Sequence, residues 1–184
     1  DGLIKDVGPL GNKEAKRIIG ATGRFVAPGF IDITNHSDSN GSLFQDPLQE
    51  SSLTQGVTTI VVGNCGVSLA PLGSPDAIKS LGKWQDISQA NINWQGLGEF
   101  LDELSRHQLG INVATLVGHN TLRRGVIGDE VRPLQPEEIL KMHYLIRKSI
   151  EEGAFGFSTS LANAHEDVST TEELTAIVRI LGTS

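Results

Sequence analysis

Residues 57–72 read VTTIVVGNCGVSLAPL, and this stretch decides how the rest of the chain is interpreted. Its first six residues are apolar or threonine and do not alternate with charged residues, which is typical of a strand buried on both faces of a parallel sheet. Three other short runs have the same character: GFIDIT at 29–34, INVATLVG at 111–118 and AFGFSTS at 154–160. The chain is therefore expected to contain four buried, parallel strands.

Helical patterns lie between and after these runs, at 46–56, 97–110, 135–153 and 170–182. In the first, Asp46 is the expected N-cap and Pro47 the first helical residue. In the last, Thr170 and Glu173 form a capping-box pattern. Strands that alternate with helices predict right-handed βαβ units and an α/β fold.

Two segments do not fit this alternation. Residues 73–96 interrupt it after the second strand and are interpreted as an insertion. Residues 1–27 are rich in glycine and mixed in character, and are interpreted as small β-structure outside the main sheet. An independent doubly wound domain of four or five strands is the alternative fold, and it leaves both segments unexplained.

The composition of the chain argues against nucleic-acid and membrane partners. The 184 residues carry 15 Lys and Arg against 22 Asp and Glu, a formal charge of −7 at pH 7, which argues against nucleic acid. No run approaches the ~20 apolar residues of a membrane span, and the first residues lack the features of a signal peptide. Cys65 is the only cysteine, so no internal disulfide can form. We therefore expect a cytoplasmic protein with no nucleic-acid or membrane partner.

Side chains able to do chemistry follow the carboxyl end of every expected strand, and the candidates are His36, Asn64, Cys65, His119 and Ser158. His165 and Glu166 follow the fourth strand a few residues later. In parallel α/β folds these strand ends converge on one face, where active sites form. The sequence therefore predicts one site at this edge of the sheet.

Cys65 has three interpretations on these residues alone. It could be a small buried hydrophobe. It could be a nucleophile, for which His36 or His119 would supply the base. It could also be a zinc ligand together with His36, because the two follow adjacent strands. The two histidines could instead bond loop carbonyls, and the residues by themselves leave these alternatives open.

Four stretches resemble, in order, the motifs of the N-acyl-D-amino-acid deacylases (D-aminoacylases) of the metal-dependent amidohydrolase superfamily. They are VAPGFIDITNHSD (26–38), QGVTTIVVGNCGVSLAPL (55–72), NVATLVGHNTLR (112–123) and GAFGFSTSL (153–161). The second is specific to this branch, whereas PGFID marks only the superfamily. The resemblance implies that residues 28–184 form the first four β/α units, the N-terminal half, of a (β/α)8 TIM-type barrel with an insertion at 73–96. It also implies that residues 1–27 are part of a small β-sandwich domain.

The resemblance further implies a zinc-dependent hydrolase that cleaves the amide of small N-acyl-D-amino acids. The cysteine of the GNCG motif is a zinc ligand in that family, so Cys65 inherits this role, and His36 becomes a residual ligand. Asn64, His119 and Ser158 are expected to line the substrate pocket because of their position at the strand ends. The general base and most other ligands are expected beyond residue 184, in a missing C-terminal half or a second polypeptide.

The sequence departs from the family pattern at two places, of which the first bears on the metal site and the second on substrate selectivity. Thr34 stands where the superfamily has the first histidine of a His-x-His motif, and ANAHED (162–167) replaces the usual loop after the fourth strand. A barrel of this type also needs eight strands and ~250 residues. A truncated, catalytically inactive amidohydrolase-like protein is therefore one alternative. A different cyclic-amide hydrolase, similar to hydantoinase or dihydroorotase, is the other, although the GNCG motif and the missing His-x-His count against it.

Overall fold

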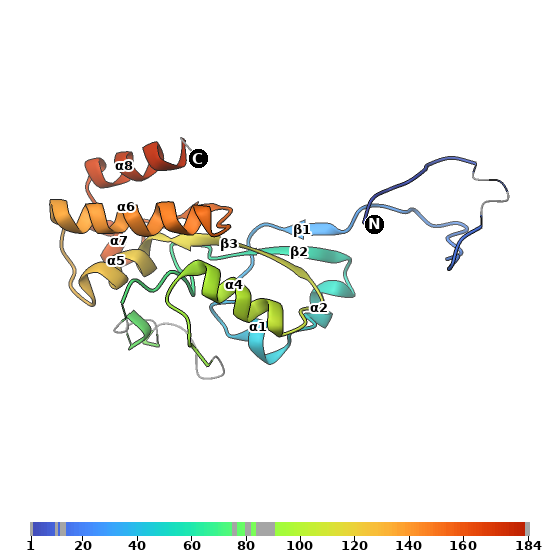
Figure 1. Cartoon of the computed structure of the whole chain (residues 1–184), viewed down its shortest axis with the longest axis horizontal. Coiled ribbons are helices and arrows are strands. Elements are labelled where there is room, and N and C mark those ends of the chain that lie inside the picture. Colours follow the sequence, from blue (N-terminus) through green and yellow to red (C-terminus); the bar gives the residue numbers. More distant parts are fainter. Residues whose placement is uncertain are drawn as a thin grey trace.

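The computed structural model describes residues 2–9, 11, 14–74, 77–79, 82–83 and 91–182. Its centre is a curved sheet of four strands in the order β1-β2-β3-β4 (Figure 1), namely β1 (Phe30–Asp32), β2 (Val57–Val62), β3 (Asn112–Gly118) and β4 (Gly156–Ser158). All three neighbouring pairs are parallel. The strand order follows the chain without the reversal of a doubly wound sheet. The prediction of a half-barrel is confirmed, and the doubly wound alternative is wrong.

The helices occupy the connections and the end of the chain: α1 (Ser42–Gln45), α2 (Glu50–Leu53), α4 (Leu97–Arg106), α5 (His119–Ile127), α6 (Pro136–Glu151), α7 (Ala164–Asp167) and α8 (Thr171–Leu181). The helices expected at 97–110, 135–153 and 170–182 are confirmed as α4, α6 and α8. Helix α5 was not expected. It is buried on nearly every side, so its sequence has no one-sided apolar pattern to reveal it.

The helix expected to start at Asp46 and Pro47 is wrong. Asp46 instead ends α1, and α2 begins only at Glu50. The reason is Gln49, which is buried and takes the left-handed backbone conformation at φ 49°. Its side-chain amide donates to the carbonyl oxygens of Ser42 and Asp46, at 3.0 and 2.7 Å. These hydrogen bonds, together with one from the Ser37 hydroxyl to the Gln49 side-chain oxygen, outweigh the capping preference of Asp46.

The core has two clusters of buried apolar side chains. One packs β2 against α4 and the end of the 73–96 segment, through Ile60, Val62, Trp94, Leu97, Phe100 and Leu104. The other joins β3 to α5, α6 and α8, through Val117, Leu122, Met142, Ile146, Ile177 and Ile180. The insertion therefore has a packing role at its described end, where the Trp94 indole donates to the Leu69 carbonyl at 2.8 Å. Much of the rest of it lies outside the described residues.

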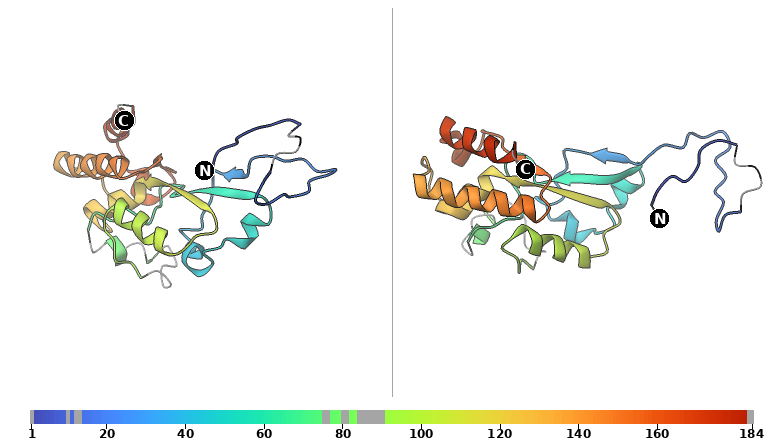
Figure 2. Two further views of the ribbon diagram at one scale, coloured as in Figure 1. Left: turned by 45° about the vertical axis from the view of Figure 1, so that its right-hand side comes forward. Right: turned by 45° about the horizontal axis from the view of Figure 1, so that its top comes forward.

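The chain before Phe30 extends away from the sheet (Figures 1 and 2), and its described residues contain no strand. Its apolar side chains are exposed, Phe25 completely. The β-sandwich expected for residues 1–27 therefore stays a prediction. Strand β1 is also open to solvent, with Phe30 and Ile31 more than half exposed.

The segment after β2 lies backbone against backbone on the end of β3 and on α5. A Cβ atom built on Gly118 would lie 2.5 Å from the Gly66 carbonyl oxygen, and one on Gly125 would lie 2.4 Å from the Leu72 carbonyl oxygen. Real Cβ atoms do not approach oxygen this closely, so only glycine fits at either position. These contacts hold residues 63–72 against the sheet.

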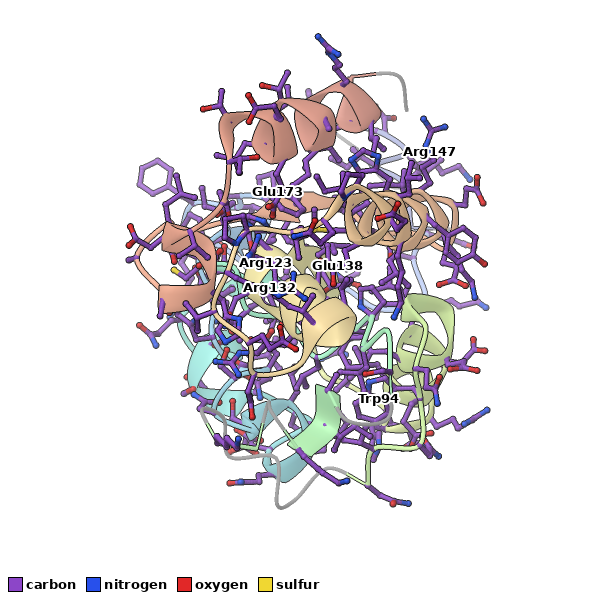
Figure 3. All side chains as sticks on the ribbon, turned by 90° about the vertical axis from the view of Figure 1, so that its left-hand side faces the viewer. Trp94, Arg123, Arg132, Glu138, Arg147 and Glu173 are labelled. Carbon is purple, nitrogen blue, oxygen red and sulfur yellow. The ribbon has the colours of Figure 1, made fainter. Side chains whose placement is uncertain are left out.

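A buried ion pair fastens α8 to α5. Arg123 Nη1 lies 2.6 and 2.7 Å from the two carboxylate oxygens of Glu173, and neither side chain is exposed. His119 Nε2 lies 2.8 Å from the same carboxylate. Figure 3 shows Arg123 and Glu173 close to Arg132, whose carbonyl accepts a hydrogen bond from Arg123. Burial raises the pKa of Glu173, but the hydrogen bonds and charges of His119 and Arg123 outweigh burial and leave this pKa below its usual range.

Replacing Gly118 with alanine tests the backbone contact. We expect Gly118→Ala to lower the free energy of unfolding by about 1–3 kcal/mol, because the new methyl group overlaps Gly66 and Ser68. Gly98→Ala in α4 is the matched control, since its methyl group would lie at an ordinary 3.4 Å from Glu152. The control should leave stability unchanged or raise it by up to about 1 kcal/mol. Urea unfolding measures both, and equal effects would contradict the contact.

Replacing Glu173 tests the ion pair. Glu173→Gln should lower the free energy of unfolding by about 3–5 kcal/mol near neutral pH, because Arg123 is left buried without its partner charge. Glu172→Gln, one residue earlier and exposed, should cost less than about 1 kcal/mol. Because the folded-state pKa of Glu173 is depressed, its stabilisation is complete above pH ~4.3 and is lost as the pH falls through the folded value. Urea unfolding of wild type and variant should therefore converge in acid, and a constant difference would contradict this account.

Candidate functional site

A pocket of about 420 Å³ opens at the carboxyl end of the sheet. Three of the predicted site residues line it, namely His36, Asn64 and Cys65. Residues from α5, including Asn120 and Arg124, and from the segment 162–165 complete the lining. The strand ends thus bring the predicted metal ligands into one concave site, as parallel α/β folds do.

Cys65 sits in a constrained turn directly after β2. Its backbone lies in the left-handed region, at φ 55°, which is uncommon for a residue with a side chain and marks local strain. On one side of it, the Gly63 amide donates to Asp38 Oδ2 at 2.9 Å. The Asn64 amide group donates to the carbonyl oxygens of Val61 at 2.8 Å and Asn35 at 3.1 Å. The turn therefore presents an exposed thiol on a fixed backbone.

Ser158, at the end of β4, holds this turn from the other side. Its hydroxyl donates to the Gly63 carbonyl and accepts from the Gly66 amide at 3.0 Å. The two glycines flank Asn64 and Cys65 in the chain. Ser158 is not among the pocket-lining residues, so its observed contacts position the cysteine turn. Its predicted contact with substrate stays a prediction.

His119 is fully buried at the first position of α5. Its Nδ1 lies 3.2 Å from Thr159 Oγ1, and its Nε2 lies 2.8 Å from Glu173 Oε1. Both ring nitrogens are thus occupied by protein oxygens, and His119 is not among the residues that line the pocket. The structure places it beneath the pocket, where it joins α8 to the strand end; direct contact with substrate also stays a prediction.

Asp38 was quoted within the first-strand motif but was assigned no role from the sequence. It is almost completely buried and accepts hydrogen bonds from the amides of Gly63 at 2.9 Å and Ser39 at 2.8 Å. Burial raises the pKa of Asp38 above its usual range, against the opposing effect of these hydrogen bonds. The carboxylate ties the loop after β1 to the loop after β2, which keeps His36 and Cys65 in one pocket.

His165 and Arg124 are pocket residues that the sequence analysis did not assign. His165 is 3% exposed, and its Nδ1 has no hydrogen-bond partner among the described residues. Burial, followed by the positive charges of Arg124 and Arg123, lowers its pKa. Position was the only available signal for His165, since it follows β4. For Arg124 the signal was a pair of arginines directly after HNTL.

The donor chemistry of the pocket fits part of a zinc site. A cysteine thiolate and a histidine nitrogen are typical zinc ligands, and Cys65 and His36 share the pocket. Among the described residues no group of three or more His, Cys, Asp or Glu side chains is arranged to hold a metal. Thr34 is exposed, and its amide donates to Asp32 Oδ1 at 3.1 Å. These residues thus supply two candidate ligands and no complete site.

No helix in the part of the chain that the structure describes has the length and apolar character needed to cross a membrane.

Comparison with known proteins gives relatives along nearly the whole chain. A D-aminoacylase from Alcaligenes xylosoxydans xylosoxydans is 34% identical over 178 residues, which cover 97% of this chain and 36% of the relative. An N-acyl-D-glutamate deacylase from the same organism is 34% identical over 181 residues, which cover 96% of this chain and 35% of the relative. The chain thus spans little more than a third of the length of these relatives.

Solved structures agree with these relatives. A D-aminoacylase described with a binuclear metal center superimposes with a TM-score of 0.73 at 33% identity, over 85% of this chain and 32% of that one. An N-acyl-D-glutamate deacylase from Bordetella bronchiseptica, complexed with zinc and a phosphonate inhibitor, gives a TM-score of 0.74 at 34% identity, over 89% and 33%. Residues 17–182 match the sequence profile of the Amidohydrolase family, so the resemblance noted in the sequence is confirmed and the chain belongs to this family.

Proposed function

We propose that these residues form the cysteine-bearing part of a zinc-dependent amidohydrolase that cleaves the amide bond of N-acyl-D-amino acids. The products are a carboxylic acid and a D-amino acid. The observation that carries this proposal is the shared pocket of Cys65 and His36 at the carboxyl end of a parallel sheet. The D-aminoacylase and deacylase relatives support the same reaction.

In this proposal Cys65 and His36 hold the metal. When bound, zinc supplies a Lewis acid and lowers the pKa of a coordinated water to about 7. The remaining residues position these ligands. Ser158 and Asp38 fix the backbone on either side of Cys65 through the bonds to Gly63 and Gly66. A thiol on a strained turn whose flanking glycines are hydrogen-bonded is already oriented before a metal arrives.

The role of Cys65 as a nucleophile is less well supported. A cysteine nucleophile needs a base within hydrogen-bond reach. His119 is committed to Thr159 and Glu173 through its two ring nitrogens, so it is poorly placed to serve as that base. His36 remains in the pocket and could serve as the base. However, a thiolate and an imidazole together are the pair of ligands that zinc prefers, so the ligand role for His36 is better supported.

We further propose that the other ligands and the general base come from a segment beyond residue 184 or from a second polypeptide. Two observations support this. The described residues hold no complete ligand group, and the chain spans about a third of each similar enzyme. A general base would take a proton from the attacking water and pass it to the leaving amine.

A catalytically inactive protein is the second candidate. Thr34 favours it, because this exposed residue occupies the position at which the superfamily resemblance expects the first metal-binding histidine. A hydroxyl group is a poor zinc ligand, and only two of the four usual donors are then present in the pocket.

Cobalt binding separates these candidates without an activity assay. The chain, stripped of metal with a chelator, is titrated with Co²⁺ while the thiolate-to-cobalt charge-transfer absorption is recorded. We expect a saturable band in wild type, none in Cys65→Ser, and weaker binding in His36→Asn. His107→Asn is the matched control, because His107 is a partly exposed residue next to Glu103 on α4. A wild-type chain without the band would overturn the assignment of Cys65 and His36 as a metal-binding pair within these residues.

Hydrolysis tests the reaction itself. The protein at its natural length is assayed for release of amino acid from N-acetyl-D- and N-acetyl-L-amino acids, and for ring opening of hydantoin and dihydroorotate. We expect release from the D-isomers only. Loss of a residue that only supports a metal ligand costs roughly 10–100-fold in activity. Cys65→Ser removes a ligand itself, so kcat/KM should fall by at least this factor. Ring opening without D-isomer hydrolysis would point to a cyclic-amide hydrolase instead.

A further inference from the structure

The pocket that holds Cys65 has a lining suited to an anion. None of the described residues that line it is an aspartate or a glutamate. The polar residues include one arginine, Arg124, two histidines, His36 and His165, and the side-chain amide of Asn120. Arginine and amide groups donate hydrogen bonds, and arginine is the usual partner of a carboxylate in proteins.

Arg124 carries a permanent charge in a mostly buried position. Its side chain is 6% exposed, and its Nη1 lies 2.8 Å from Asp129 Oδ1. Its Nε donates to Asn120 Oδ1 at 3.3 Å, which fixes the guanidinium against α5. Asp129 is half exposed and also pairs with Lys83. Arg124 is the one Lys, Arg, Asp or Glu residue among the described residues that line the pocket.

His165 adds a second, independent sign of a ligand. Its ring is 97% buried and lines the same pocket, yet its Nδ1 has no hydrogen-bond partner among the described residues. A buried polar atom without a partner costs roughly 1–3 kcal/mol, so such an atom calls for an explanation. A bound group that reaches into this corner of the pocket would supply the missing partner, through the donor or acceptor capacity of a neutral imidazole.

We infer that Arg124 and His165 form an anion subsite that binds a carboxylate of the substrate other than the α-carboxylate. The substrate class is then an N-acyl-D-amino acid with an acidic side chain or with a dicarboxylic acyl group. This inference rests on the proposed function, which places the scissile amide at Cys65. The subsite and Cys65 line one pocket of about 420 Å³, a volume that one such small molecule can span.

Binding to the metal-free chain tests this inference apart from catalysis. Calorimetry compares N-acetyl-D-glutamate with its neutral isostere N-acetyl-D-glutamine, and N-succinyl-D-leucine with N-acetyl-D-leucine. We expect a preference of about 10-fold for the charged member of one pair, because a charged hydrogen bond is lost in the other member. The pair that shows the preference identifies whether the side chain or the acyl group carries the carboxylate.

Variants then assign the preference to Arg124. Arg124→Gln should abolish it, Arg124→Lys should retain part of it, and Asp129→Asn should strengthen it by removing a competing carboxylate. Arg106→Gln is the matched control, since Arg106 is an exposed arginine on α4 that pairs with Glu103. If Arg124→Gln fails to fold, Asp129→Asn still tests the inference, because this variant should increase the preference for the charged ligand and not lower it.

Three outcomes would overturn the inference: no preference in either pair, a preference that survives in folded Arg124→Gln, or an equal loss of N-acetyl-D-leucine binding. The last would mean that Arg124 holds the α-carboxylate. No metal is present in this experiment, so its outcome does not depend on Cys65 and His36 acting as metal ligands. If the charged ligand is still preferred but the chain does not bind cobalt, the proposed metal centre is wrong and the anion subsite is not.

Discussion

The close approach of the Gly66 carbonyl to Gly118 is the constraint on which the rest of the site depends. It brings the cysteine turn, which follows β2, onto the point where β3 ends and α5 begins. Ser158 from β4 and Asp38 from the loop after β1 then bond to Gly63 in the same turn. All four strand ends thus meet around Cys65, which explains how one thiol and residues from distant parts of the chain share a pocket.

Buried charges continue this arrangement outward from the pocket. The Glu173 carboxylate on α8 is hydrogen-bonded to Arg123 and His119. His119 also contacts Thr159 at the end of β4. The Thr159 hydroxyl donates to Glu166 at 3.0 Å, and Glu166 also accepts from the Asn163 side-chain amide of the pocket wall. Groups of this kind are costly to bury singly and stable only when paired. The position of the pocket wall is therefore linked to the docking of the last helix.

The open side of the sheet has a different character. Among the described residues β1 pairs only with β2, and β4 only with β3, so each has one parallel neighbour there. Phe30, Ile31 and Ile33 are exposed close to the free edge of β1. Exposed apolar strands of this kind favour pairing with a further chain segment. This agrees with the proposal that additional ligands reach the pocket from outside the 184 residues.

The sequence by itself determined the parallel strands, most of the longer helices and the family, because buried strands and motifs such as GNCG are local patterns. It also located His36, Asn64 and Cys65 at the strand ends, where the structure brings them together. Only the tertiary structure decided the roles of Gln49, Asp38, Arg124 and His165, and placed His119 and Ser158 behind the pocket. The physical reason is that these roles depend on burial and on hydrogen bonds that form only in the folded chain, and those of Asp38 and Ser158 join residues 25 and 95 positions apart.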